Sequence, residues 1–166
     1  SIKQIFSSAK NLGGSLSDYT VWLLERSIKT LFIRVQAQNI NARLIADFLE
    51  KESWVEKVYY PGLKNHPKHN TAKMQMKGFG GVLSFSLYGE KDLIPLFITK
   101  LTFAHAAAHL GSVDTIVGPP KTTSHVENTM EERSALGIPE NMIRCSVGIE
   151  NIDDIKRDFL QALESL

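Results

Sequence analysis

The chain has 166 residues, 43% of them hydrophobic and 22% charged, which suits one domain with a sizeable core. Because 19 Lys or Arg residues face 18 Asp or Glu residues, the net charge of +1 gives no reason to expect a nucleic acid or an anionic membrane as partner. No apolar run approaches the roughly 20 residues that cross a bilayer, no signal peptide is visible, and the single cysteine, Cys145, favours a reducing, cytoplasmic compartment.

A helical pattern dominates the first third of the chain. Residues 1–14 end in a Gly-Gly breaker. Ser15 or Ser17 can then cap a helical stretch over about residues 16–51, either as one long helix or as two abutting helices. Apolar side chains recur along it at helical spacing: Leu23, Leu24, Ile28, Leu31, Val35, Ile40, Leu44 and Phe48.

Strands and helices alternate in the remaining sequence. The patterns predict strand 55–63, helix 66–76, strand 82–89, helix 90–101, an ambiguous segment 102–111, an extended segment 115–125, helix 129–139, strand 142–149 and helix 151–166. This order indicates an α/β or α+β fold. We expect a mainly antiparallel sheet with helices 16–51 and 151–165 packed on the same side. We expect residues 1–50 to form an N-terminal segment with a linking helix, and residues 51–166 a small α/β domain.

The histidines give only a weak metal signal. His105 and His109 are four residues apart, as in zinc helices, but the glutamate between such histidines and an obvious third ligand are missing. His66 and His69 flank a proline in what is predicted to be a surface turn. We therefore expect no metal site.

Other candidate reactive groups also favour structural roles. Ser124 and His125 are adjacent, and neighbours in an extended segment seldom form a productive nucleophile–base pair. The "GFGG" stretch at 78–81 lacks the Lys-Ser/Thr and the following helix of a phosphate-binding loop, so a tight turn is expected there. Cys145 is expected to be a buried, inert thiol.

Arg144 differs, because it interrupts the apolar strand "MIRCSVGIE". A buried guanidinium needs a carboxylate or phosphate close by, and its fork matches a carboxylate bidentately. Two partners stay open. One is the carboxylate of an α-amino acid, and the other is an internal acid such as Glu150 or Glu127.

Several segments, in order, resemble a known family. They are "SLSDYTVWLLERSIKTLFIRVQAQNINARLIADFLE", "VEKVYYPGL" followed by "MKGFGGVLSF", "HLGSVDTIV", and "ALGIPENMIRCSVGIENIDDI". Across essentially the whole chain they are similar to the C-terminal part of the Cys/Met-metabolism, pyridoxal phosphate (PLP)-dependent trans-sulfuration enzymes. This family includes cystathionine γ-synthase and γ-lyase, methionine γ-lyase and O-acetylhomoserine sulfhydrylase.

The resemblance implies the small C-terminal domain of a fold-type-I PLP enzyme, with the long helix leading into it. In the family, the Schiff-base lysine and the cofactor's phosphate and ring contacts lie in an N-terminal domain. None of the lysines here lies in a matching motif, so we expect no catalytic residue and no bound PLP in this chain alone. The complete enzyme is expected to bind PLP through that N-terminal domain, on the same or a separate chain, and to form a homo-oligomer.

Three substrate-binding residues follow from the same resemblance. Arg144 stands at the family's arginine that binds the substrate α-carboxylate. His109, preceded by Ala108, stands where the family has the serine of its Ser-Leu-Gly segment. Ser124 stands at the threonine of the segment that appears here as "PKTTSH", with His125 at its histidine.

Two functions are therefore expected as alternatives. The chain is either the substrate-binding part of an enzyme that eliminates or replaces the γ-substituent of sulfur-containing or O-acylated homoserine-type amino acids, or a non-catalytic remnant or interaction module. The departure at His109 leaves γ-lyase, γ-synthase and sulfhydrylase open.

Overall fold

The computed structural model describes residues 2–14, 16–89 and 92–166. Contacts divide the chain into residues 1–33 and residues 34–166, and each unit is described by itself. The boundary between these units differs in kind from the division expected after residue 50, which therefore stays a prediction. No helix in the described part of the chain is long and apolar enough to cross a membrane.

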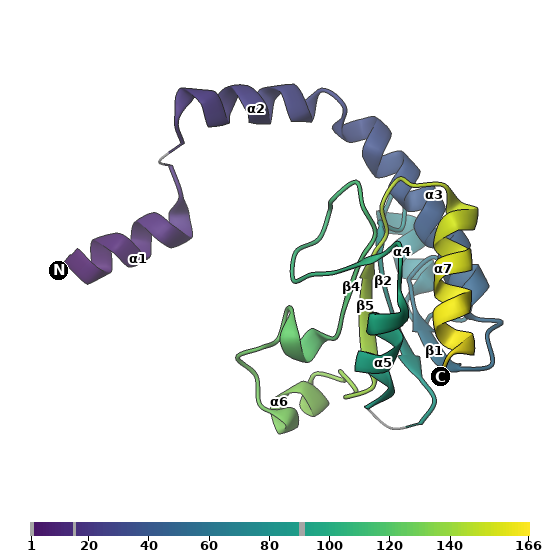
Figure 1. Cartoon of the computed structure of the whole chain (residues 1–166). Helices are drawn as coiled ribbons and strands as arrows, with labels where there is room; N and C mark the ends of the chain where they lie inside the picture. Colours follow the sequence, from purple (N-terminus) through teal and green to yellow (C-terminus); the bar gives the residue numbers. More distant parts are fainter. Residues whose placement is uncertain (1, 15, 90–91) are drawn as a thin grey trace. The chain divides into compact units, whose positions relative to one another are not determined.

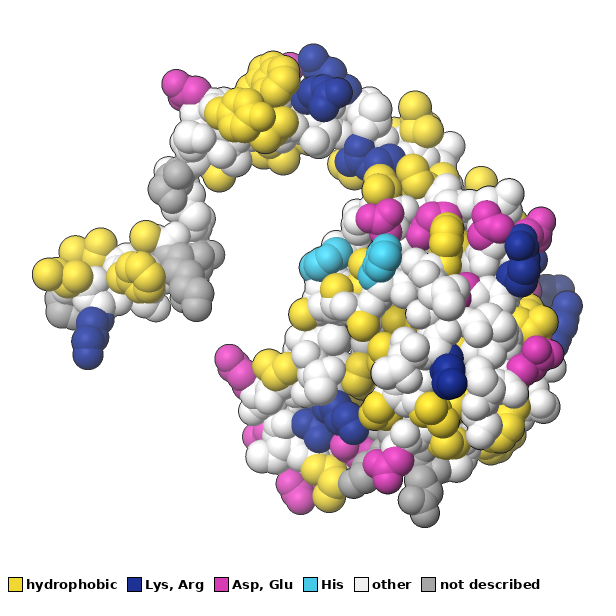
Figure 2. All heavy atoms as spheres, viewed as in Figure 1, with side chains coloured by type: hydrophobic (Ala, Val, Ile, Leu, Met, Phe, Trp, Pro, Cys, Tyr) yellow, Lys and Arg dark blue, Asp and Glu magenta, His cyan; other side chains and the backbone are white. Residues whose placement is uncertain are grey.

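The first unit holds α1 (Ile2–Leu12) and α2 (Asp18–Ile28). The sequence patterns predicted no helix where α1 lies. Ser17 caps α2, because its Oγ accepts a 3.3 Å hydrogen bond from the backbone N–H of Thr20; Ser15 lies outside the described residues. Figure 2 shows apolar side chains gathered on α2, where the exposed ones include Tyr19, Val21, Trp22, Leu24 and Ile28.

The expected helical stretch consists of two abutting helices. A two-residue turn follows α2, and α3 then runs from Leu31 to Leu49. Most of α3 belongs to the second unit. Its buried residues are Gln38, Asn41, Ala42, Ile45, Ala46 and Leu49.

A five-stranded sheet forms the centre of the second unit in the part of the chain that the structure describes. Its spatial order is β1 (Val55–Tyr59), β2 (Val82–Leu87), β5 (Met142–Ser146), β4 (Ile116–Gly118) and β3 (His105–Ala106). Every neighbouring pair is antiparallel except β3 and β4, which are parallel. The mainly antiparallel α/β sheet is therefore confirmed, and part of the ambiguous segment 102–111 is a short edge strand.

Helices cover one face of this sheet. Ile143 and Cys145 of β5 lie opposite Phe85 and Leu83 of β2, and all four are in the hydrophobic core. The same core contains buried side chains of α3, α5 (Leu93–Lys100) and α7 (Ile152–Glu164). Figure 1 shows α3 and α7 on the same side of the strands, as predicted. The aromatic rings of α5, α7 and β2 meet there, at centroid distances of 5.8–6.3 Å, through Phe85, Phe97 and Phe159.

The other face carries the alternate residues of the same strands. Met142, Arg144 and Ser146 point away from the helix-covered core, because successive side chains of a strand face opposite ways. The short helix α6 (Met130–Ala135) lies on the side of the strands away from α7 (Figure 1), and it follows the 3-10 turn at Pro120–Thr122.

Local signals explain several helix ends. Thr129 and Glu132 form the expected capping box of α6, and Asn151 caps α7 by accepting the N–H of Asp153 at 2.9 Å. The helix α4 (His69–Gln75) follows the Pro61–Gly62 turn after β1.

Candidate functional site

Arg144 lies in the middle of β5, on the face without α3, α5 and α7. Its strand neighbours Ile143 and Cys145 are fully buried in the core, whereas Arg144 is half-buried. Across the sheet it is in register with Ser84 of β2 and Gly118 of β4. The predicted placement on a strand is confirmed.

The guanidinium of Arg144 binds backbone oxygens rather than an acid. Its Nη2 donates to the carbonyl oxygens of Ala108 at 3.0 Å and of His109 at 3.1 Å. Its Nε and Nη1 donate no hydrogen bond to any residue the structure describes, and no described carboxylate forms an ion pair with it. The cation is therefore held in place while its charge has no acidic partner within the described residues.

The internal acids proposed as partners are engaged or exposed. The Glu150 carboxylate accepts the backbone N–H of Thr115, and also its hydroxyl at 2.9 Å. Glu127 is exposed. The sequence alternative of an ion pair between Arg144 and Glu150 is thus not what the structure contains.

His109 meets Arg144 through its backbone. Its carbonyl oxygen is one of the two acceptors of Nη2, and its side chain is exposed. The residue belongs to an irregular loop between β3 and β4, which begins where Ala107 donates its N–H to Val117 at 3.3 Å. The structure therefore brings His109 and Arg144 together, as the resemblance suggested.

Ser124 lies in a separate segment that starts beside Arg144. Gly118 pairs with Arg144, and the chain then turns so that the N–H of His125 reaches the Pro120 oxygen at 2.8 Å. No hydrogen bond joins Ser124 to Arg144 or His109 among the described residues. Contrary to expectation, Ser124 does contact its neighbour, since its Oγ lies 2.9 Å from Nδ1 of His125.

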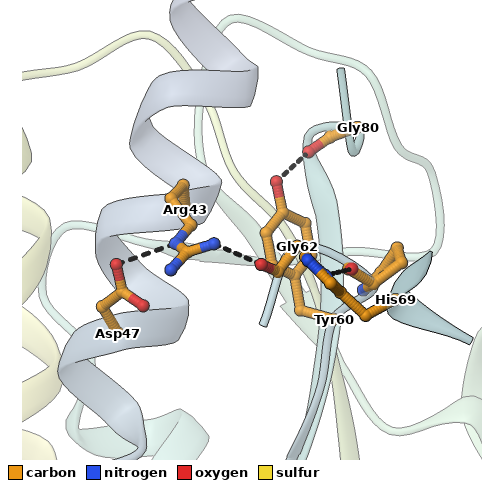
Figure 3. Close-up of polar contacts among 7 residues, drawn as sticks. Arg43, Asp47, Tyr60, Gly62, His69 and Gly80 are labelled. Carbon is orange, nitrogen blue, oxygen red and sulfur yellow. Dashed lines mark hydrogen bonds and ion pairs between the residues drawn. The ribbon is translucent and has the colours of Figure 1, made fainter. Parts of the chain in front are cut away.

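A second polar cluster joins α3 to the turn after β1 (Figure 3). Arg43 forms an ion pair with Asp47 at 2.8 Å and donates to the Gly62 oxygen. Tyr60 donates its hydroxyl to the Gly80 oxygen at 3.0 Å, and burial raises the pKa of Tyr60 to about 12. These contacts tie the "GFGG" loop to the core.

His69 completes this cluster in a structural role. Its Nδ1 lies 2.8 Å from the Pro61 oxygen, and its ring stacks on Phe79 at a centroid distance of 5.6 Å. The described residues contain no group of three or more His, Cys, Asp or Glu side chains that could hold a metal ion.

Cys145 fits the expectation of a buried thiol. The residue is completely buried, and desolvation raises its pKa, so the reactive thiolate is disfavoured.

Each lysine whose exposure the structure describes is exposed or half-buried, so this chain by itself does not enclose any of them. Arg144, with unbonded Nε and Nη1, fits a carboxylate.

Comparisons with known proteins agree with this architecture. Residues 1–164 match the family model described as Cys/Met metabolism PLP-dependent enzyme. The chain is 43% identical to the chloroplastic cystathionine gamma-synthase 1 of Arabidopsis thaliana over 93% of its own length and 28% of that protein's. It is 36% identical to the O-succinylhomoserine sulfhydrylase of Pseudomonas aeruginosa over 99% of its own length and 41% of that protein's.

Solved structures show the same fold. The cystathionine gamma synthase of Xanthomonas oryzae pv. oryzae, in complex with aminoacrylate and cysteine, superposes with a TM-score of 0.87 and 34% identity. The match covers 98% of this chain and 42% of that one. The chain thus spans less than half the length of these relatives, and it belongs to the family of Cys/Met-metabolism PLP-dependent enzymes.

Proposed function

We propose that this chain is the C-terminal, substrate-binding part of a PLP-dependent trans-sulfuration enzyme. Its role is to bind the α-carboxylate of an amino-acid substrate through Arg144. The observation that carries the proposal is a half-buried strand arginine, fixed by two carbonyl oxygens and without an acidic partner among the described residues. A guanidinium in this state favours an incoming carboxylate.

The names of the relatives support a substrate class. Those matched here are named as cystathionine synthases and lyases and as an O-succinylhomoserine sulfhydrylase. We propose γ-elimination or γ-replacement on sulfur-containing or O-acylated homoserine-type amino acids. His109 and Ser124 border the segments that approach Arg144 and are proposed to contact the rest of the substrate.

Arg144 would act by positioning. A carboxylate bound to Nε or Nη1 fixes the orientation of the substrate's α-carbon relative to the sheet, which lowers the entropic cost of reaching a reactive geometry. The lysine that carries PLP is proposed to lie in an N-terminal domain, on the same or a separate chain, so this chain alone is expected to be inactive. The complete enzyme is proposed to be a homo-oligomer.

The compartment is also a proposal. The single, fully buried cysteine favours a reducing compartment, and we propose the cytoplasm, although the Arabidopsis relative is chloroplastic.

Substitution of Arg144 in the full-length protein tests the function. Arg144→Ala should weaken the binding of cystathionine by roughly 2–4 kcal/mol, the scale for losing a charge-assisted partner. Arg144→Lys should recover only part of this loss, because the ammonium lacks the planar fork. PLP content, measured by absorbance, should be unchanged.

The matched control is Arg157→Ala. Arg157 is exposed, and within the described residues its one ion pair is with Asp154 on the surface of α7, so its loss should not alter substrate affinity. Cystathionine affinity that is equal in Arg144→Ala, Arg157→Ala and wild-type protein would contradict the proposed role.

A further inference from the structure

Gln38 is a buried polar residue on α3 that reaches a distant loop. Only 8% of the residue is exposed, and its Nε2 donates to the backbone oxygen of Ser112 at 2.7 Å. The two residues are 74 positions apart in sequence. A buried amide is costly unless its hydrogen bonds are made, so this contact fixes both the side chain and the loop.

The loop that Gln38 contacts is the one that holds Arg144. Residues 108–112 form no regular secondary structure, and side chains bind their backbone instead. Arg144 binds the oxygens of residues 108 and 109, Ser146 accepts the N–H of Gly111 at 3.0 Å, and Gln38 binds the oxygen of Ser112. Hydrogen bonds with the side chains of Arg144, Ser146 and Gln38 therefore hold the backbone of residues 108–112 in place.

Gln38 lies on a different element from Arg144 and Ser146. Arg144 and Ser146 both project from the same face of β5, whereas Gln38 comes from α3. Gln38 thus fixes the loop relative to the hydrophobic core and not only relative to its own strand.

Close packing leaves Gln38 little freedom. A Cβ placed on Gly81 would lie 2.9 Å from the Cβ of Gln38, so the glycine is needed for this approach. The oxygen of Gly81 in turn accepts the N–H of Val147 at 2.8 Å, next to the end of β5. The side chain is therefore held between the start of β2 and the loop, in one orientation.

We propose that Gln38 is a positioning residue for carboxylate recognition. By holding Ser112, it keeps the carbonyl groups of Ala108 and His109 where they fix Nη2 of Arg144, and the other guanidinium nitrogens stay directed at the substrate. This inference rests on the proposed function of Arg144, and it adds a residue of α3 to the determinants of substrate affinity.

The test separates carboxylate recognition from a general structural role. In the full-length protein, dissociation constants are measured for norleucine and for pentylamine, the same molecule without the carboxylate. Gln38→Met keeps the length of the side chain but removes the donor. It should raise the dissociation constant of norleucine roughly three- to tenfold, the range for one lost hydrogen bond, and leave that of pentylamine unchanged. With cystathionine, KM should rise while kcat stays close to the wild-type value.

Two further variants keep the test decisive. Gln36→Met makes the same chemical change at an exposed position of α3 and should alter neither constant. Ser146→Ala removes a smaller contact from the same loop, that with Gly111, and should act in the same direction as Gln38→Met even if the latter folds poorly.

Two results in Gln38→Met and Ser146→Ala would overturn the inference. One is an equal rise in the dissociation constants of norleucine and pentylamine, and the other is no change in either constant. Arg144→Ala distinguishes this result from failure of the proposed function. If Arg144→Ala selectively weakens norleucine binding and the two loop variants do not, Arg144 retains its role and Gln38 loses its own. If Arg144→Ala changes nothing, both proposals fail.

Discussion

The Asp158 carboxylate on α7 accepts the backbone N–H of Ala104 at 2.8 Å. The same carboxylate accepts the N–H groups of Thr102 and Phe103 and the Thr102 hydroxyl, at 2.7–3.1 Å. The last helix thereby anchors the segment that enters β3, and the bonded residues are 54–56 positions apart in sequence.

Asp158→Asn should lower the free energy of unfolding by about 2 kcal/mol at neutral pH, because an amide cannot accept all of these bonds as a carboxylate does. Urea unfolding of the 166-residue chain measures the difference. A stability equal to that of the wild type would show that the anchor contributes little.

The same carboxylate predicts a pH dependence. Burial tends to raise the pKa of Asp158, but the hydrogen bonds from Ala104, Thr102 and Phe103 outweigh it and lower the pKa below 3.8. Its contribution is therefore complete above the unfolded-state pKa, about 3.9, and is lost as the pH falls through the lower folded-state value. Unfolding curves at decreasing pH should show the wild type and Asp158→Asn converging in acid, and parallel curves would argue against this assignment.

Replacing Arg133 and replacing Arg144 should lower the stability of the fold by different amounts. Arg133 forms a 2.8 Å ion pair with Glu140, and its side chain is 11% exposed. Arg133→Ala should therefore cost about 2–3 kcal/mol of stability, since it leaves the acid without this partner. Arg144→Ala should cost less than about 1 kcal/mol of stability, because it removes only the hydrogen bonds from a half-buried guanidinium to two backbone oxygens. Thermal melts compare them, and a larger loss for Arg144 would indicate a structural role.

Tyr60 should make the stability of the fold sensitive to alkali. Burial raises its pKa to about 12, so its contribution is complete below the unfolded-state value of about 10 and is lost as the pH rises through the folded-state value. Tyr60→Phe should cost about 1 kcal/mol at neutral pH, through the lost bond to Gly80, and this difference should shrink or reverse above pH of about 10. Ultraviolet titration of the tyrosinate should show one late-ionising tyrosine, absent in the variant; its presence in both would exclude Tyr60.

Gly148 should tolerate no side chain. A Cβ there would lie 2.2 Å from the Val113 oxygen and 2.2 Å from Oε2 of Glu150. Gly148→Ala should destabilise the chain by more than about 2 kcal/mol, because backbone on one side and a bonded carboxylate on the other cannot both move away. Urea unfolding of the variant measures this, and near-wild-type stability would mean that the loop relaxes easily.

Sequence patterns predicted the elements with strong local signals. Alternation in β5 placed Arg144 on a strand, and Thr129 and Asn151 marked two helix starts. The patterns missed α1, although Ile2, Ile5 and Phe6 have helical spacing, because the glycines that follow were the stronger signal.

The contacts of the candidate site were harder to predict from the sequence. Carbonyl oxygens hold Arg144, and because every residue type has a carbonyl group, no sequence pattern marks Ala108. Gln38 did leave a signal, since it occupies the same helical stripe as the buried Ala42, Ile45 and Leu49. The apolar series read from the sequence lies on another face of α3, where Ile40 is 61% exposed, and this concealed the polar residue within the buried stripe.

The alternation of β5 has a consequence for how this protein can diverge. Ile143 and Cys145 lie in the core, while Arg144 and Ser146, which alternate with them, contact the loop at the candidate site. Under the proposed function, a substitution of Arg144, which is half-buried on the face away from the core, would alter ligand preference while leaving Ile143 and Cys145 in place. An insertion or deletion of one residue within the strand would exchange the two sets, turning a cation into the interior and a hydrophobic side chain outward. If the proposed function holds, descendants of this sequence can change specificity by replacing side chains on this face of β5, but not by changing the length of the strand.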